Sequence, residues 1–196
     1  MATHPLVLAS GSPYRRDLLN KLQLPFTTAS PDIDETPHFN EAPEQLAMRL
    51  SAAKARALRE AFPQHLIIGS DQVALLGGRQ LHKPGGFDEA VTQLESTAGR
   101  SLCFYTGVSL LNSQSGRQLN AIDVCRVHIR KLTRGQIEDY VRREQPYDCV
   151  GAFKSEGLGV SLIRAFEGED PNALVGLPLI KLIDLLQRFG VQVLPP

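Results

Sequence analysis

A short apolar segment that passes through a turn into a helix constrains the fold of this chain more than any other feature. Leu6–Ala9 has the length and flanks of a buried strand. The turn Ser10-Gly11-Ser12-Pro13 comes next, where Ser12 can cap a helix and Pro13 can take its first position. The segment therefore predicts a buried strand that leads directly into a helix beginning at Pro13.

The first turn of this helix carries two adjacent arginines, Arg15 and Arg16. Cations are unfavourable there because the helix dipole already makes the N-terminus positive. Two of them therefore suggest that an anion binds at this end. Backbone N–H groups, the flexible Gly11, the serine hydroxyls and the guanidinium groups together form a credible phosphate site.

Length and charge limit the class of protein. The 196 residues suit a single domain over residues 1–196, with one or two lobes. Lysine plus arginine equals aspartate plus glutamate, with 21 of each, so the formal net charge is zero. A general binder of DNA or RNA backbones is normally clearly basic, so no nucleic acid polymer is expected as a partner. A small charged substrate needs only a local cluster of cations.

Cysteine usage and the N-terminal sequence predict a cytoplasmic protein. Cys103, Cys125 and Cys149 are widely spaced and lack the C-x-x-C pattern of zinc or redox sites, which favours reduced thiols in a core. The first residues do not resemble a signal peptide, and no apolar run approaches the length that spans a membrane. No membrane partner is therefore expected.

An acidic, proline-bracketed loop precedes the clearest helix. The loop, residues 31–40, carries three carboxylates and is either a solvated connection or a source of a magnesium ligand. The helix is expected over residues 43–61, with Asn40 or Glu41 near its cap. Lys54 follows its apolar stripe closely, so this side chain could point inward.

The most apolar stretch, residues 66–76, is interrupted by Gly69-Ser70-Asp71-Gln72. An aspartate flanked on both sides by strand-forming residues is costly to bury without a partner or a metal. One interpretation is a bulge or turn with a satisfied aspartate. The other is a catalytic carboxylate at a break in a central strand.

The remaining elements follow from periodicity and turn chemistry. Thr133-Arg134-Gly135-Gln136 has the form of a capping box. The glycine-punctuated loop 149–159 matches neither a phosphate-binding P-loop nor a dinucleotide-binding fingerprint. We expect strands at residues 24–30, 79–84, 101–111, 117–129 and 160–166, and helices at 87–98 (capped by Asp88), 133–143, from Asp170 and from Pro178 to Gly190.

Cations and carboxylates thus gather at strand ends and glycine breaks, where open α/β folds bind ligands. Phosphoryl chemistry needs both kinds of group, because cations neutralise phosphate oxygens while carboxylates hold Mg²⁺ and orient water. Each residue alone could be an ordinary surface charge. The candidates are Arg15, Arg16, Lys54 and Lys83 among the cations, and Asp34, Glu35 and Asp71 among the carboxylates.

Five motifs resemble those of the Maf family of nucleoside triphosphate pyrophosphatases, and they occur in the expected order from Leu6 to about Phe189. The motifs are Ser10-Gly-Ser-Pro-Tyr-Arg-Arg-Asp-Leu-Leu, Ile33-Asp-Glu-Thr-Pro, Gly69-Ser-Asp-Gln, Lys83-Pro and Val175-Gly-Leu-Pro. The resemblance implies an α/β fold similar to that of inosine triphosphate pyrophosphatases. Such a fold has an elongated mixed β-sheet flanked by helices, with two lobes and a central cleft.

The resemblance also implies roles for individual residues. Asp71 would be the catalytic residue, as general base or as a metal-held carboxylate that activates water. Glu35 would lie with Asp71 on the metal side, the metal being Mg²⁺ or Mn²⁺. The triphosphate would be lined by Ser10, Arg15, Lys54 and Lys83. A homodimer is also implied.

Three positions differ from the pattern of family members that act on pyrimidine triphosphates, which typically have Arg, Thr and Gln there. This chain has Tyr14, Gln72 and Glu156. The set resembles the branch of the family that hydrolyses 7-methylguanosine triphosphate. Methylation at N7 makes the purine cationic, so Tyr14 could stack on the ring and Glu156 could offset its charge or accept from guanine N–H groups. Alternatively, Tyr14 and Glu156 are ordinary exposed residues.

Two other functions remain open. A hydrolase of the same family could prefer a pyrimidine such as dTTP or UTP. A non-catalytic nucleotide-binding regulator of cell division would need only the cations, and the acidic residues speak against it.

Overall fold

The computed structural model describes residues 5–194 and has the α/β composition that the sequence predicts. Two short 3₁₀ helices lie at Val150–Ala152 and Leu158–Leu162. The strands are β1 (Leu6–Ala9), β2 (Phe26–Ala29), β3 (Leu66–Leu76), β4 (Arg79–Leu81), β5 (Ser101–Asn112), β6 (Gln118–Ile129) and β7 (Ile163–Glu167). The α-helices are α1 (Pro13–Asn20), α2 (Pro43–Ala57), α3 (Phe87–Thr97), α4 (Arg134–Glu144), α5 (Pro171–Val175) and α6 (Leu179–Arg188).

The strands form one mixed sheet, in the order β2-β1-β3-β5-β6-β7, with β4 paired to β3. Strand β1 runs parallel to both β2 and β3, whereas β4 is antiparallel to β3 and β7 is antiparallel to β6. The prediction of a mixed sheet flanked by helices is confirmed.

The chain divides into two compact units. The first contains the chain up to Gln72, residues Tyr105–Asp123 and the chain from Asp170 onward. The second contains Val73–Phe104 and Val124–Glu169. Two units agree with the expected two lobes, while the cleft and the single functional domain over residues 1–196 stay predictions.

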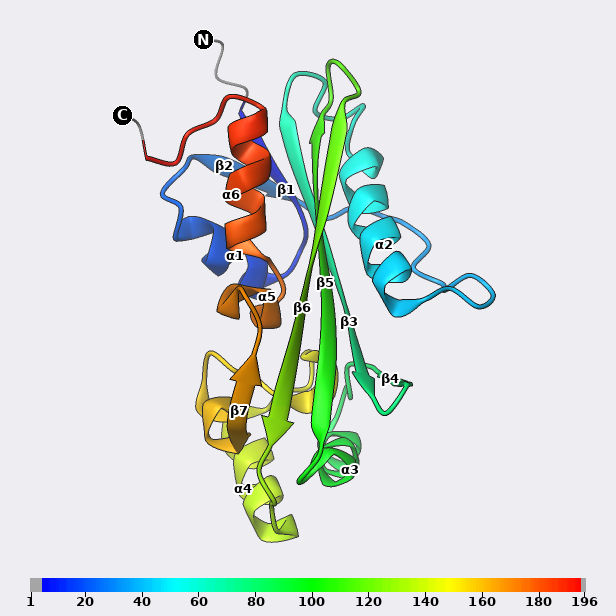
Figure 1. Cartoon of the computed structure of the whole chain (residues 1–196), viewed down its shortest axis with the longest axis vertical. Helices are drawn as coiled ribbons and strands as arrows, with labels where there is room; N and C mark the ends of the chain where they lie inside the picture. The colour runs from blue at the N-terminus through cyan, green and yellow to red at the C-terminus, as the bar shows by residue number, and fades with distance from the viewer. Residues whose placement is uncertain (1–4, 195–196) are drawn as a thin grey trace. The chain divides into compact units, whose positions relative to one another are not determined.

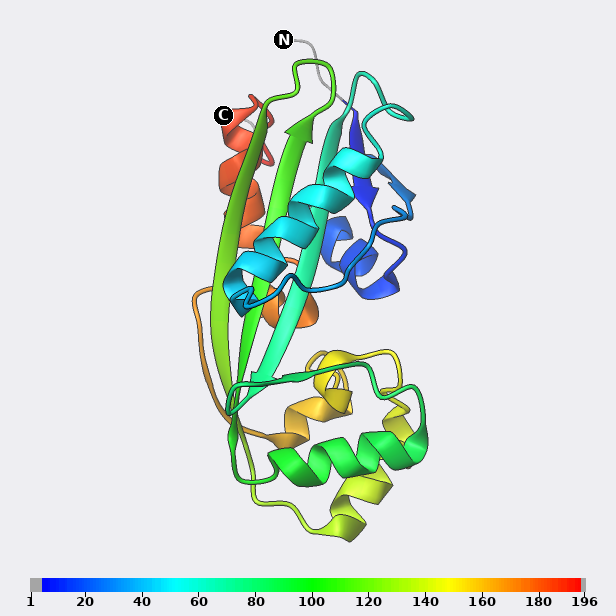
Figure 2. The same cartoon turned by 90° about the vertical axis from the view of Figure 1, so that its right-hand side faces the viewer.

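In the first unit, β1 is buried on both faces, as its continuous apolar run predicts. Leu6 and Leu8 belong to a core with α1 and α6, whereas Val7 and Ala9 belong to a second core with α2. Alternate residues of a strand point to opposite faces, so one short strand supports both layers. Helix α2 accordingly lies on one side of the sheet, with α1 and α6 on the other (Figures 1 and 2).

In the second unit, α3 and α4 pack against each other. Ala90 and Leu94 of α3 are fully or almost fully buried, as are Ile137 and Val141 of α4. The predicted capping box at Thr133 and Gln136 is confirmed.

Strand β3 corrects the expectation of a break. It continues as a strand from Leu66 to Leu76, and Asp71 lies inside it. Gly69 does not interrupt the strand, and its lack of a side chain lets helix α2 pack closely on the sheet. Asp71 is therefore part of a strand and does not lie in a turn.

Several element ends also differ from the expected ones. Helix α2 ends at Ala57, and its cap residue is Ala42. Helix α3 is capped by Gly86, so Asp88 lies in its first turn. A 3₁₀ helix replaces the first part of the strand expected over 160–166, which begins only at Ile163.

Among the described residues, the three cysteines form no disulfide, as predicted, but only Cys125 is buried in the core, while Cys103 and Cys149 are partly exposed. Between residues 5 and 194, none of the helices combines the length and apolar character that crossing a bilayer demands.

Candidate active site

Parallel pairing brings the turn after β1 next to the middle of β3. Ala9, the last residue of β1, pairs with Gly69 on one side and with Ala29 on the other. Because β1 ends there while β3 continues, the turn beginning at Ser10 leaves the sheet beside Ser70 and Asp71. The carboxyl ends of parallel strands are the usual ligand edge of an open α/β sheet.

Two glycines let helix α2 approach this part of the sheet closely. A Cβ atom on Gly69 would lie 2.1 Å from the Ser51 carbonyl oxygen, and one on Gly107 of β5 would lie 2.5 Å from the Ala47 carbonyl oxygen. Side chains at these strand positions would therefore push the helix away. The close packing fixes the height of α2 above the sheet and with it the position of Lys54.

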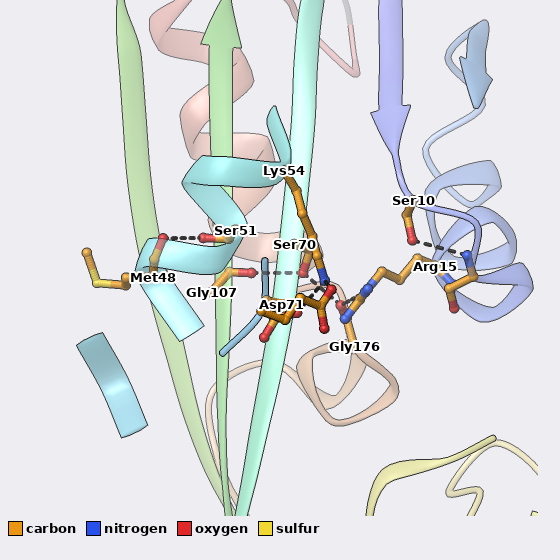
Figure 3. Close-up of polar contacts among 11 residues, drawn as sticks. Ser10, Arg15, Met48, Ser51, Lys54, Ser70, Asp71, Gly107 and Gly176 are labelled. Carbon is orange, nitrogen blue, oxygen red and sulfur yellow. Dashed lines mark hydrogen bonds and ion pairs between the residues drawn. The ribbon is translucent and has the colours of Figure 1, made fainter. Parts of the chain in front are cut away.

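The Lys54 ammonium group lies between two carboxylates. Its Nζ atom is 2.5 Å from Oδ1 of Asp71 and 2.7 Å from Oε1 of Glu35. The Lys54 and Asp71 side chains are only 10% and 11% exposed, whereas Glu35 is 58% exposed. The expectation that Lys54 points inward is confirmed, and Figure 3 shows it reaching from α2 to Asp71 on β3.

The loop that carries Glu35 is anchored to helix α2. Arg49 donates two hydrogen bonds to the Glu41 carboxylate, at 2.6 and 2.8 Å, and a third to the Thr36 carbonyl oxygen at 3.0 Å. These bonds from Arg49 lower the pKa of Glu41 to about 2. Glu41 is thus a loop anchor and does not cap the helix.

Arg15 approaches the same part of β3 from helix α1. Its Nε atom donates to the Gly176 carbonyl oxygen at 2.8 Å (Figure 3). Burial lowers the pKa of Arg15, and the negative charges of Asp71 and Glu35 partly oppose that change. A guanidinium group has five N–H donors, and this bond uses one of them, so Arg15 can still bind an anion.

The Gly176 carbonyl also contacts Ser70. The buried Ser70 hydroxyl lies 2.8 Å from the carbonyl oxygens of both Gly107 and Gly176. Gly176 ends helix α5 with a φ of 121°, a conformation that favours glycine. One backbone carbonyl thereby connects α1, β3 and the turn after α5.

Ser10 and Arg16 lie at the start of helix α1. The Ser10 hydroxyl accepts from the Ser12 backbone N–H at 3.1 Å, and Ser12 caps the helix as predicted. A depression of about 130 Å³ is lined here by Ser10, Gly11, Ser12, Pro13, Arg16, Thr28, Ala29 and Ser30. The polar lining agrees with the predicted anion site, while Arg15 points to Asp71 instead.

Gln72 has an internal role. Its Nε2 atom donates to the carbonyl oxygens of Ala173 and Leu174, at 2.9 and 3.0 Å, and to the Thr106 hydroxyl at 3.0 Å. The amide nitrogen is therefore occupied in holding helix α5. Its predicted contact with the base stays a prediction.

The other predicted residues are distributed over both units. Tyr14 is half-buried in the first turn of α1. Lys83 and Glu156 are exposed and belong to the second unit, Lys83 in the loop after β4. The loop that carries Glu156 is attached to α4, because the Leu158 N–H donates to Glu144 at 2.6 Å. Their predicted roles stay predictions.

The carboxylates fit a divalent cation of the magnesium type, although they do not form a complete cage. No group of three or more His, Cys, Asp or Glu side chains in the described part of the chain could hold a metal ion by itself. Mg²⁺ is commonly bound through one or two carboxylates together with water and substrate phosphates. Glu35 and Asp71 already share one cation, the Lys54 ammonium, so they can also share a metal ion.

Sequence reasoning missed several residues that hold this site. Gly107 has no side chain, and Ser70 was singled out only as part of the Gly69-Ser-Asp-Gln motif, so their contacts alone reveal their roles. Asp170 is completely buried and accepts backbone N–H groups from Asn172 at 2.9 Å and from Ile180 at 2.7 Å. It thereby ties α5 to α6, beyond the predicted cap of a single helical turn.

Comparisons with known proteins show which proteins this chain resembles. A family model described as Maf-like protein matches residues 5–189. A protein of Pseudomonas aeruginosa named 7-methyl-GTP pyrophosphatase is 54% identical over 188 residues, covering 96% of this chain and 98% of that protein. A protein of the same name from Vibrio vulnificus is 50% identical over 194 residues, covering 99% of this chain and all of that protein.

A solved HAM1 protein from Coxiella burnetii matches 66% of this chain and 75% of its own, with 17% identity and a TM-score of 0.47. The family model covers nearly the whole length of the chain. The two relatives are 54% and 50% identical to it, and each alignment covers almost all of this chain and of the relative. The chain belongs to the Maf family.

Proposed function

We propose that this protein hydrolyses 7-methyl-GTP to 7-methyl-GMP and pyrophosphate. The observation that carries the proposal is the Asp71–Lys54–Glu35 group, with Arg15 beside it, at the carboxyl edge of β1. The names of relatives at 50% to 54% identity supply the substrate. In the cell, this activity would keep modified nucleotides out of nucleic acids.

The reaction needs a water molecule activated near the α-phosphorus. In the proposed mechanism, Asp71 orients this water and accepts its proton. A bond forms between the water oxygen and the α-phosphorus, while the bond from that phosphorus to the oxygen bridging to the β-phosphorus breaks. Both electrons of the broken bond leave with pyrophosphate.

Cations stabilise the charge that develops on the leaving group. Arg15 and Lys54 are proposed to bind phosphate oxygens from the first unit, and Ser10 adds a hydroxyl at the start of α1. Lys83 is proposed as a further phosphate ligand. Mg²⁺ or Mn²⁺, held by Glu35 and Asp71, would supply additional charge neutralisation.

The base is proposed to be selected by its positive charge. Tyr14 would stack on the methylated ring, and Glu156 would offset its charge. Gln72 would act on selection through helix α5, which it holds at Ala173 and Leu174. We further propose a cytoplasmic homodimer that acts on free nucleotides.

A nucleotide panel tests the function. Purified protein with Mg²⁺ or Mn²⁺ should release pyrophosphate and a nucleoside monophosphate from 7-methyl-GTP, with a kcat/KM well above the values for GTP, UTP and dTTP. Higher kcat/KM for UTP or dTTP would instead identify the pyrimidine branch of the family. Nucleotide binding without product would support a regulator.

A further inference from the structure

The Lys54 ammonium group occupies the space that a metal ion shared by Glu35 and Asp71 would need. We propose that Lys54 and a divalent cation compete for these two carboxylates. Binding of the metal would then require Lys54 to leave them, which frees its ammonium group for the phosphates of the substrate. This proposal rests on the proposed function, which takes a divalent cation and the phosphates of a nucleotide as the two ligands of the site.

The competition follows from distance and charge. A single Nζ atom lies within 2.7 Å of an oxygen from each carboxylate, so Lys54 neutralises both at once. An ammonium group and a divalent cation that share the same two oxygens would repel each other at close range, in a place where the Lys54 and Asp71 side chains are almost buried. The two cations cannot both keep the short contacts.

The surroundings let Lys54 move while its helix stays in place. Helix α2 is fixed against the sheet at Gly69 and Gly107, but the four-carbon stem of lysine is flexible. Glu35 is more than half exposed, so the ammonium group can leave toward solvent on that side. Such a movement would explain why Lys54 contacts carboxylates in this structure although it is predicted to bind the phosphates of the substrate.

A consequence is cooperation between metal and nucleotide. Without ligands, the positive charge of Lys54 is neutralised by the two carboxylates. After the carboxylates bind a divalent cation, the lysine charge becomes available to an anion. A first ligand that removes an internal competitor makes the second bind more tightly.

Metal binding without nucleotide tests the proposal directly. Mn²⁺ is titrated calorimetrically into the wild type, Lys54→Gln, Lys54→Met and the control Arg56→Gln. Arg56 lies on the same helix and donates to Gln118 (2.7 Å), so the control removes one positive charge without touching Glu35 or Asp71. Both Lys54 variants should bind Mn²⁺ about tenfold more tightly than the wild type, a typical coupling between two sites. Arg56→Gln should bind it with wild-type affinity.

A measurement on the wild type avoids any folding defect of the variants. The rate at which Lys54 is acetylated, followed by mass spectrometry, should rise when Mg²⁺ is added, while the rate at the exposed Lys131 should not change. The proposal would be overturned if both Lys54 variants bound Mn²⁺ no more tightly than the wild type. It would also be overturned if the acetylation rate of Lys54 did not change when Mg²⁺ is added. Absence of pyrophosphate release by the wild type would instead reject the proposed function.

Discussion

Replacing Asp71 with asparagine should lower kcat for 7-methyl-GTP about a thousandfold, within the range that a general acid or base contributes. The variant keeps the shape of the side chain and one oxygen acceptor. It loses the negative charge and the capacity to take a proton from water. Asp71 is also the carboxylate that contacts Lys54 at 2.5 Å, so the change weakens the metal side of the site as well.

The fold should survive this substitution. Asp71 lies within a regular strand, and Lys54 keeps Glu35 as a partner. Asp184→Asn, at an exposed position of α6, is the matched control and should retain wild-type turnover. Turnover of Asp71→Asn at the wild-type rate, with a cooperative thermal unfolding transition, would remove Asp71 from the mechanism.

Replacing Gly69 with alanine should destabilise the protein by about 3 kcal/mol, the upper part of the usual range for overpacking. The added Cβ would lie 2.1 Å from the Ser51 carbonyl oxygen and 2.9 Å from the Ala55 backbone nitrogen. Both atoms belong to the backbone of α2, so a change of side-chain rotamer cannot relieve the clash. The helix itself must move, and Lys54 moves away from Asp71 with it.

Chemical denaturation and steady-state kinetics on the same preparation measure both effects. Gly135→Ala is the matched control, because Gly135 lies in α4 and a Cβ there meets no atom within 4 Å. This control should be neutral or slightly stabilising, since alanine favours helix over glycine. Wild-type stability of Gly69→Ala would show that α2 does not depend on this close contact.

Local sequence features predicted the parts of the molecule that depend on neighbouring residues. Leu6–Ala9, the cap at Ser12 and the start of α1 at Pro13 all lie within one short segment, and the structure confirms them. Lys54 was predictable to point inward because the apolar stripe of α2 passes close to it. The periodicity of a helix encodes its buried face directly.

The errors arise where distant residues decide the structure. Its sequence neighbours alone suggest that Gly69 breaks the strand. In the structure, Gly69 instead leaves the space that lets α2 pack closely on the sheet. Arg15 and Gly176 are joined by a hydrogen bond across 161 positions of sequence, and no periodic pattern indicates that contact. The ion pairs of Lys54 likewise depend on how a loop, a helix and a strand fold together.

The most direct test of the central claim, attack by water on the α-phosphorus of 7-methyl-GTP, is hydrolysis in water enriched in the heavy isotope of oxygen. Mass spectrometry of the two products locates the label. We expect the heavy oxygen in 7-methyl-GMP and none in pyrophosphate. Label in pyrophosphate, or release of inorganic phosphate with the label in either product, would contradict the account.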